Sequence, residues 1–547
     1  MLFSFGSSLC VLSALLAAER SVAVELTGYA KDMFDESMDF LDQIYDPEAG
    51  YLSYFYYPLA AGRHETRSSI WYASGLLQRN EGSDLEEAIK VITNIIGGQE
   101  KNVSAQWYGD YTKYPEEPTV GSPAYEPVIY GSWDPNWRGF IGTALVVIYE
   151  EFQDILPAEV QELILESMYN NTIGDSYRVG GVDDDNLYPS YSNPSLMRAV
   201  GTGWTGRKLN DSNMTAAGEQ YANEVLDLFN LNNTLSEFNS PTYVGVSIYA
   251  LTLWAKYMPE DSVMGQNGKR LIQEIWATEA ELYNANLKNL AGPWDRAYGY
   301  DMNKYIAIMT LHIYTLVGKE KTPISSRPWA MTHADDYEYA PLIAVLAPFH
   351  NSLLPNETVS KFLTFPGEHT YTTSAFSPPT DTYPRNYTTW LSANLTIGAQ
   401  SFDEDAVGGP RYDSSQWTPA AVQWLRSDGS VGYFTWYATE AALAVDVAPN
   451  ALNLSYPHGN STTPFTFLVQ SNPLGGKRDI TGLQDIQGLN IAAVSGTVNL
   501  EPTVSFCGLL GGSCDPIHGF EFWNLTYSMP ANSTEIPSIH FTIELDD

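Results

Sequence analysis

Two consecutive segments decide the fold: GVSIYALTLWAKY at residues 245–257 and RLIQEIWATEAELYNANL at residues 270–287. The first is apolar nearly all round at helical spacing, which indicates a helix that is buried on every side. The second is amphipathic and charged, which indicates a helix with one face in water. Alternating buried and half-exposed helices are typical of an α/α toroid, in which outer helices surround inner ones.

The same alternation runs from residue 24 to about residue 355. Further segments of the buried type are 68–77, 137–149 and 303–317, and further amphipathic segments are 84–97, 157–169 and 216–229. The sequence therefore predicts an (α/α) toroid of five or six helix pairs, which we place at residues 24–360.

The hydrophobic pattern of the sequence changes after about residue 360. Short alternating runs are separated by Gly, Asn and Asp turns, and RSDGSVGYF at 426–434 carries an Asp-Gly hairpin signal. These features predict an antiparallel β-sandwich over residues 361–547. The fold class is α+β, with a helical toroid followed by a sandwich. We expect residues 365–387 to form a loop over the cleft of the toroid.

Several features indicate a secreted, extracellular protein. An apolar run at 9–18 followed by small residues at 21–23 predicts a signal peptide over residues 1–23. Twelve Asn-x-Ser/Thr sites are typical of a glycosylated surface. Cys507 and Cys514, in CGLLGGSC, are expected to form a disulfide outside the cell. No later run has the roughly 18 to 20 apolar residues of a membrane span.

Composition narrows the class of ligand. The net charge of -37 argues against nucleic acid and against an anionic membrane as partners. The 36 Tyr and 14 Trp favour a glycan ligand, because aromatic faces stack on sugar rings, although aromatic packing between helices is the alternative. The sequence has neither a GxxxxGK phosphate loop nor a GxSxG elbow, which argues against a nucleotide enzyme and an α/β hydrolase.

Five loops before the predicted inner helices carry the unusual polar residues. They lie at 62–69, 131–139, 189–198, 236–243 and 292–305. Because the inner helices of a toroid run parallel, their starts gather at one rim. We therefore expect these loops to line one cleft.

The loop at 236–243 contains a helix-start signal and two polar residues that this signal does not explain. Ser240 followed by Pro241 fits a helix N-cap with proline at the first helical position. This explanation does not account for Asn239, just outside the helix, or for Tyr243, one turn inside it. Both are therefore candidate site residues, with the Asn239 amide facing a ligand.

The other loops supply further candidates, each with a structural alternative. The structural alternatives are capping by Glu65, helix packing by the tryptophans, and an Asp-Arg pair at 295–296. The candidates are His64, Arg67, Trp133, Asn136, Arg138, Arg296, Tyr298, Tyr300 and, beside Asp335 and Asp336, His333. His312 lies on an apolar face and is expected in the core. Metal-ligand spacing is absent, so no cofactor or metal is predicted; structural calcium at 183–185 or 403–405 remains open.

With this layout, the chain resembles the α/α-toroid polysaccharide lyases of the heparinase and chondroitin or alginate lyase type. These join a helical toroid to a C-terminal antiparallel β-sandwich, and Asn or Glu, His, Tyr and Arg line their cleft. EFNSPTY at 237–243 resembles the Asn-bearing loop, with Asn239 as the matching residue. The compact Asn-Asn-His pattern of the family is absent, so the choice between His64 and His333 stays open.

The resemblance implies β-elimination at a uronate in a polysaccharide or oligosaccharide. Asn239 and an Arg would neutralise the carboxylate, a Tyr or His would take the C5 proton, and a Tyr would return one to the leaving oxygen. The implied catalytic residues are Asn239, Tyr243, His64, Arg296, Tyr298 and His333. The implied substrate-binding residues are Arg67, Trp133, Asn136, Arg138 and Tyr300.

Two other functions stay open. A toroid glycoside hydrolase needs two carboxylates, roughly 6.5 to 9.5 Å apart if it inverts. Its candidates are Asp134, Asp295, Asp301 and Asp336. A non-catalytic glycan-binding protein is the other alternative. Four arginines in the rim segments favour the lyase: Arg63, Arg67, Arg138 and Arg296.

Overall fold

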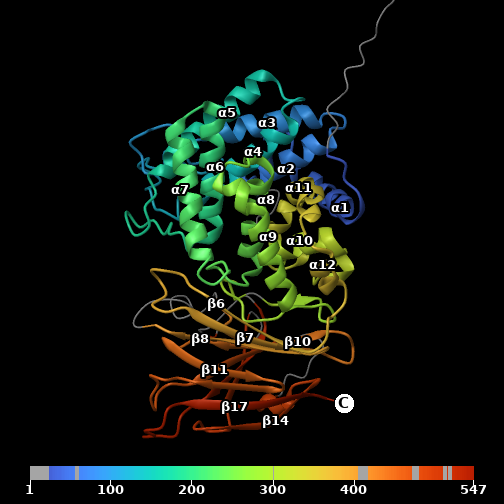
Figure 1. The fold of residues 1–547 in the computed structure, drawn as a ribbon, viewed down its shortest axis with the longest axis vertical. Helices are drawn as coiled ribbons and strands as arrows, with labels where there is room; N and C mark the ends of the chain where they lie inside the picture. Colours follow the sequence, from blue (N-terminus) through green and yellow to red (C-terminus); the bar gives the residue numbers. More distant parts are fainter. Residues whose placement is uncertain are drawn as a thin grey trace, which may run out of the picture.

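A computed structural model describes residues 24–55, 61–299, 301–404, 417–470, 480–508, 514 and 520–546. The predicted signal peptide lies outside these residues. Figure 1 shows the helices in one half of the molecule and the strands in the other. Of the labelled strands, β6 (His369–Ala375) lies nearest the helices, and its neighbour β7 (Arg385–Leu391) follows in the same sheet. The predicted fold class, a helical domain followed by a β-sandwich, is confirmed.

Within the described residues, six helices form an inner ring in which each packs on the next and the last closes on the first. They are α2 (Thr66–Arg79), α4 (Asn136–Phe152), α6 (Ser192–Leu209), α8 (Pro241–Tyr257), α10 (Ile308–Val317) and α11 (Ala340–Ser352). Their apolar pattern explains this position, since all of α8 up to Trp254 is buried. The helix predicted from residue 303 begins only at Ile308, because Tyr305 pairs with Thr332 in an extended bridge.

The amphipathic helices pack outside this ring. They are α1 (Gly28–Ile44), α3 (Asp84–Gly97), α5 (Ala158–Ser176), α7 (Ser212–Phe229), α9 (Val263–Leu282) and α12 (Asn356–Leu363). Close inner-outer packing needs small residues at the contact. A Cβ atom on Gly218 of α7 would lie 2.5 Å from the Cα atom of Gly203 of α6. None of the helices in the described part of the chain is both long enough and apolar enough to cross a membrane.

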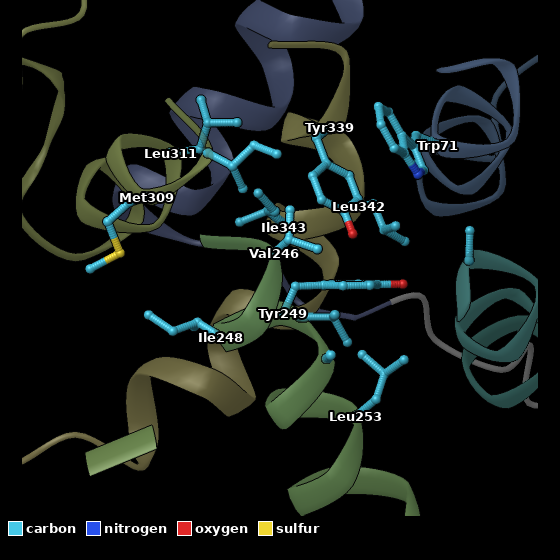
Figure 2. Close-up of a cluster of buried hydrophobic side chains, with 14 of the residues drawn as sticks. Trp71, Val246, Ile248, Tyr249, Leu253, Met309, Leu311, Tyr339, Leu342 and Ile343 are labelled. Carbon is cyan, nitrogen blue, oxygen red and sulfur yellow. The ribbon is translucent and has the colours of Figure 1, made fainter. Parts of the chain in front are cut away.

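Aromatic and aliphatic side chains fill the middle of the ring. Figure 2 shows Tyr339 between Trp71 of α2 and Tyr249 of α8. The Tyr339 ring centroid lies 4.2 Å from that of Trp71 and 5.1 Å from that of Tyr249. His312 is buried here as predicted, and its Nε2 lies 3.1 Å from the Gly245 carbonyl oxygen.

The C-terminal part of the chain is an antiparallel sandwich of two sheets. One has the order β6-β7-β8-β9-β10-β13-β16-β15 and the other β11-β12-β17-β14, with a short pairing between β8 and β11. The remaining strands are β8 (Leu395–Asp403), β9 (Ala420–Leu425), β10 (Val431–Tyr437), β11 (Ala442–Ala448), β12 (Ala451–Ser455), β13 (Phe465–Gln470), β14 (Leu489–Gly496), β15 (Thr503–Cys507), β16 (Phe522–Tyr527) and β17 (Ser538–Leu545). Phe541 of one sheet packs on Phe434 and Phe467 of the other, with centroids 6.3 and 5.2 Å apart.

Two local predictions in the sandwich are confirmed and one is corrected. The Asp-Gly signal joins β9 to β10 in a hairpin, and Cys507 forms the disulfide with Cys514. The segment 365–387, predicted as a loop, contains strand β6 and the start of β7, because its alternating Thr and Tyr residues pair across the two strands. Its tip still reaches the helical domain, where Ser190 Oγ donates to the Pro378 carbonyl oxygen at 2.7 Å.

Candidate active site

Side chains near the starts of the inner helices form a closed ring of contacts, which we call the rim ring. Its members, in order of contact, are Arg67, Trp137, Asn136, Tyr191, Arg296, Tyr243, Tyr298, His333 and Asp335. All five polar loops of the sequence contribute to it. The segment at 333–335 closes the circle.

One side of the rim ring runs along α2, α4 and the start of α6. The Arg67 guanidinium lies 5.4 Å from the Trp137 ring centroid. The Asn136 amide donates to the Tyr191 hydroxyl at 3.1 Å. The Arg296 guanidinium lies 4.8 Å from the Tyr191 ring centroid. The loops at 62–69, 131–139 and 189–198 are therefore neighbours at one end of the toroid.

The other side is a stack of two phenol rings between two basic groups. The Arg296 guanidinium lies 4.1 Å from the Tyr243 ring centroid. The Tyr243 and Tyr298 centroids are 5.7 Å apart, and the Tyr298 ring stacks on the His333 imidazole at 5.5 Å. Arg296, Tyr298 and His333 are only partly buried, so this side of the rim ring is accessible to solvent.

His333 is charged at neutral pH. Burial lowers its pKa, but the carboxylates of Asp336 and Asp335 outweigh burial and raise the pKa to about 9. The His333 Nδ1 lies 2.8 Å from Asp336 Oδ2, which also accepts a hydrogen bond from Thr242 Oγ1 at 2.8 Å. Asp335 lies 3.5 Å from the Arg67 guanidinium. These contacts tie the start of α8 to the segment before α11.

Tyr243 keeps its proton at neutral pH. Burial raises the pKa of its hydroxyl, and the Arg296 charge, which lowers it, does not offset the burial. Only 8% of Tyr243 is exposed. A protonated phenol in this position is a hydrogen-bond donor and a potential general acid.

Arg296 forms an ion pair that the sequence did not reveal. Its guanidinium donates to Glu237, whose other oxygen accepts from the Asn193 backbone N–H at 3.0 Å and from the Asn193 amide at 2.9 Å. Glu237 is 4% exposed, whereas a quarter of the Arg296 side chain remains exposed. Sequence reasoning missed Glu237, Asn193 and Tyr191; the only available signal was their position inside two of the polar loops.

Four candidate residues have backbone strain. Asn239, Arg296, Tyr298 and His333 have φ angles of 44°, 45°, 57° and 56°. Residues other than glycine rarely adopt this left-handed region, and each such residue costs on the order of 1–3 kcal/mol. Such strain clusters at functional sites when the surrounding structure imposes it. Three of the four belong to the rim ring.

Asn239 does not face a ligand, contrary to the sequence-based expectation. It is 1% exposed, and its amide nitrogen donates to the Ala291 and Pro293 carbonyl oxygens at 2.8 Å each. Both amide hydrogens therefore hold the loop that leads to Arg296. Tyr300, another predicted residue, lies outside the described residues.

His64, Trp133 and Arg138 also lie outside the rim ring. His64 is on the short strand β3 (His64–Glu65) and is 6% exposed, with Glu116 and Asp46 oxygens 2.6 and 3.3 Å from its ring nitrogens. The Arg138 guanidinium is fully buried and donates to the Tyr108 carbonyl oxygen at 2.9 Å. Trp133 is 4% exposed and lines a separate cavity.

The carboxylates proposed for a hydrolase divide into two groups. Asp295 is completely buried and pairs with Arg385 of β7, so it is not accessible to a substrate. Asp301 is 4% exposed and lies outside the rim ring. Asp134 accepts from the Asn136 backbone N–H at 2.9 Å, and Asp336 bonds to His333. Of the four proposed carboxylates, Asp134 and Asp336 are therefore the two next to the rim ring.

Two members of the rim ring, together with Asp336, have the donor atoms of a metal site. Single ligand atoms of His333, Asp335 and Asp336 all lie within 4.8 Å of one another. The proton on His333 and the Arg67 guanidinium at Asp335 would compete with a bound cation. At the acidic run 183–185, Asp185 pairs with Arg178, with 2.9 Å between Asp185 Oδ2 and Arg178 Nε.

Comparisons with known proteins give a family and distant structural similarity. A family model described as "Domain of unknown function (DUF8769)" matches residues 31–348, and one described as DUF8770 matches residues 367–544. The comparison with curated proteins found no match.

Among solved structures, heparinase III has a TM-score of 0.45 at 10% identity, covering 98% of this chain and 88% of that one. A Paenibacillus xanthan lyase has a TM-score of 0.41 at 11% identity, covering 95% of this chain and 57% of that one. A Streptomyces coelicolor A3 chondroitin AC lyase has a TM-score of 0.40 at 10% identity, covering 96% and 80%. Similarity at this level does not identify the reaction.

Proposed function

Because this chain belongs to the DUF8769 family, whose description assigns no activity, we propose its function from the rim ring: a lyase that cleaves a uronate-containing glycan by β-elimination. The observation that carries the proposal is the stack of Tyr243 and Tyr298 between the Arg296 guanidinium and the charged His333 imidazole. This stack places two positive charges and two phenols within one set of neighbouring side chains.

The reaction needs positive charge near the uronate carboxylate. When the C5 proton leaves, its electron pair forms the C4–C5 double bond and the C4–O bond breaks. Negative charge builds up on the carboxylate before that bond breaks, so preorganised donors lower the barrier. A quarter of the Arg296 side chain and a fifth of the His333 side chain are exposed, which makes both accessible to a carboxylate.

The two phenols have different proton roles in this proposal. Tyr243 keeps its proton, so it donates to the leaving oxygen. Tyr298 lies beside His333 on the partly exposed side of the rim ring, and in this proposal the Tyr298 phenolate takes the C5 proton. One proton therefore passes from C5 to the Tyr298 oxygen, and another passes from the Tyr243 oxygen to the leaving group.

A second candidate, a glycoside hydrolase, has its own support. The rim arginines are already paired with acids: Arg63 lies 3.2 Å from Glu117, and Arg296 binds Glu237. Burial also raises the pKa of Asp134, as a hydrolytic general acid requires, and Asp336, paired with His333, would be the carboxylate base. The hydrolase would use these two carboxylates in place of the phenols.

An assay of the products separates the two reactions. The protein is incubated with alginate and with a glucuronate-containing polymer, and both ultraviolet absorbance and reducing ends are followed. The lyase predicts an absorbing unsaturated uronate for each new reducing end. Reducing ends without that absorbance would contradict the lyase and support the hydrolase. Absence of cleavage, with retained binding to the polymer, would support a glycan-binding protein.

We also propose that the protein acts outside the cell. The Cys507–Cys514 disulfide supports this, because such bonds persist in oxidising compartments. Glycosylation sites such as Asn102 and Asn356 are exposed, but Asn170 is 8% exposed and accepts from the Tyr108 hydroxyl at 2.7 Å. Mass spectrometry of the secreted protein would be expected to find glycans at the exposed sites and none at Asn170.

A further inference from the structure

A cavity of about 320 Å³ lies beside the rim ring, between the end of α3 and the start of α4. Residues 97–100, 110–113 and 132–133 contribute to its wall. The wall is fixed to the start of α2, because Thr66 Oγ1 donates to the Thr112 carbonyl oxygen at 2.7 Å. Its volume is within the range of about 300–1,000 Å³ that is usual for small-molecule sites.

Two of the residues that line the cavity each have a buried oxygen atom without a hydrogen-bond donor among the described residues. Asp110 is 3% exposed; its Oδ1 accepts from the Tyr111 N–H at 3.0 Å, while its Oδ2 has no partner. Gln99 is 5% exposed; its nitrogen donates to the Gly109 and Ser167 carbonyl oxygens, while its Oε1 has no partner. Buried acceptors are normally satisfied, so both can accept from a ligand or from water.

Two indole rings form the apolar part of the wall. The centroids of Trp107 and Trp133 are 6.2 Å apart, with the ring planes tilted by 45°. The Trp107 N–H donates to a Glu100 oxygen at 3.0 Å, which orients that ring. Gly121, at φ +83°, allows the chain to pass against the six-membered ring, where a Cβ atom would lie 2.8 Å from Trp107 Cζ2. Trp107 is therefore held in place before any ligand binds.

The charges of the wall disfavour an anionic sugar. Glu100, Asp110 and Glu117 contribute carboxyl groups, and Lys113 is the one basic residue among the described residues that line the cavity. The Lys113 ammonium already donates to the Gly131 carbonyl oxygen. Burial raises the pKa of Asp110 to about 7, although Arg138 lowers it, so near neutral pH the wall is moderately negative.

We propose that this cavity is a binding site for a neutral sugar unit of a glycan. One sugar face stacks on Trp107, and sugar hydroxyls donate to Gln99 Oε1 and Asp110 Oδ2. Trp133, predicted from the sequence as a sugar-stacking residue, belongs to this site and not to the rim ring. The proposal does not depend on the reaction assigned to the rim ring.

Binding of small neutral sugars tests the proposal on the full-length secreted protein. Cellobiose, maltose and N,N′-diacetylchitobiose are titrated while tryptophan fluorescence and heat are recorded, with glucuronic acid and glucosamine as charged probes. At least one neutral disaccharide is expected to bind saturably. Trp107→Ala is expected to weaken this binding at least about tenfold. Tyr169→Ala, at an exposed tyrosine of α5, is the matched control and is expected to bind normally.

A second variant keeps the test valid if Trp107→Ala unfolds. Thr119→Trp puts a large side chain at an exposed position of the wall, so it blocks the cavity without removing packing. It is expected to abolish binding with an unchanged thermal midpoint. Tyr243→Phe is expected to leave this binding unchanged, which separates the site from the rim ring. Saturable binding of only a charged probe, of no sugar, or equally to Thr119→Trp would overturn the proposal.

Discussion

The Tyr243 hydroxyl is the atom on which the proposed elimination depends most directly. Tyr243→Phe keeps the aromatic ring under Arg296 and removes only the proton donor. Because general acid catalysis contributes about 10²–10⁴-fold, the initial rate of unsaturated product is expected to fall by that factor. Tyr169→Phe, on an exposed face of α5, is the control and should retain the full rate. A fully active Tyr243→Phe would assign the acid to another residue.

Glu279 of α9 is a buried acid with a predictable effect on stability. It is 2% exposed, lines a small cavity with Asn239, and burial raises its pKa to about 8. An unfolded glutamate titrates at about 4.3. Between about pH 4.3 and pH 8, Glu279 is therefore protonated in the folded protein and ionised in the unfolded chain. The free energy of unfolding therefore falls as pH rises, by up to about 1.4 kcal/mol per pH unit.

Glu279→Gln removes this titration, so the variant should gain stability relative to the parent as pH rises from 5 to about 8. Urea unfolding at several pH values measures the difference. Glu274→Gln is the control, because Glu274 lies on the same helix, is about a third exposed and pairs with Arg270. Its effect should stay within about 0.5 kcal/mol without a pH trend. Parallel profiles for parent and Glu279→Gln would show that Glu279 is not protonated in the folded state.

Among the elements, α8 connects the core to the rim ring. Its N-cap is Ser240, as the sequence predicted: the Ser240 Oγ accepts from the Tyr243 N–H at 3.4 Å, and Pro241 is the first helical residue. The same hydroxyl lies 3.3 Å from the Arg296 carbonyl oxygen. The start of the helix therefore also anchors the loop that carries the guanidinium.

The close packing of α8 on α10 can be tested by substituting the glycine at their contact. A Cβ atom on Gly245 would lie 2.4 Å from the Met309 backbone nitrogen, so Gly245→Ala must push the two helices apart. We expect the variant to lose about 1–3 kcal/mol in urea unfolding. Gly201→Ala in α6 is the control, because the nearest atom would be 3.9 Å away. It should gain about 0.5–1 kcal/mol from helix propensity. Stabilisation by both substitutions would contradict this packing.

Across the whole molecule, the sandwich holds the rim loops through one buried arginine. The Arg385 guanidinium of β7 binds Asp295, lies 2.8 Å from Asp381 and donates to the Ser236 carbonyl oxygen at 2.9 Å. Asp295 and Ser236 directly precede Arg296 and Glu237, which form the ion pair of the rim ring. The sheet that faces the helices in Figure 1 thus positions groups of the candidate site through Arg385 of β7.

Arg385→Met should therefore be strongly destabilising. Removing one partner of a buried ion pair costs about 3–5 kcal/mol, because the other charge stays buried. Burial raises the pKa of Asp295 to about 6 even with Arg385 present. In the variant, protonation of Asp295 relieves the unpaired charge, so the loss should be larger at pH 7.5 than at pH 4.5. Urea unfolding at both values measures it.

The control for this substitution is Arg426→Met, also in the sandwich. Arg426 is partly buried and contacts Ser430 and Gln470 through hydrogen bonds. The free energy of unfolding lost by Arg426→Met should be within about 1 kcal/mol at either pH. A similarly small, pH-independent loss for Arg385→Met would show that the buried cluster does not hold the two domains.

The sequence by itself determined the architecture and the local chemistry of its elements. The apolar and amphipathic segments became inner and outer helices, the alternating runs became strands, and Ser240 and Cys507 have the predicted structural roles. These features depend on residues a few positions apart, so periodicity and spacing encode them. Because inner helices of a toroid run parallel, the sequence also implied that their first residues would lie close together at one rim.

Only the tertiary structure decided which polar side chains face solvent at the rim where the inner helices begin. Asn239 donates to carbonyl groups more than fifty residues away, and Asp295 pairs with an arginine of the other domain. Glu237, unremarkable in the sequence, binds Arg296. The physical reason is that the burial and charge of a polar side chain depend on partners brought from distant loops, and the spacing along one chain does not specify those partners.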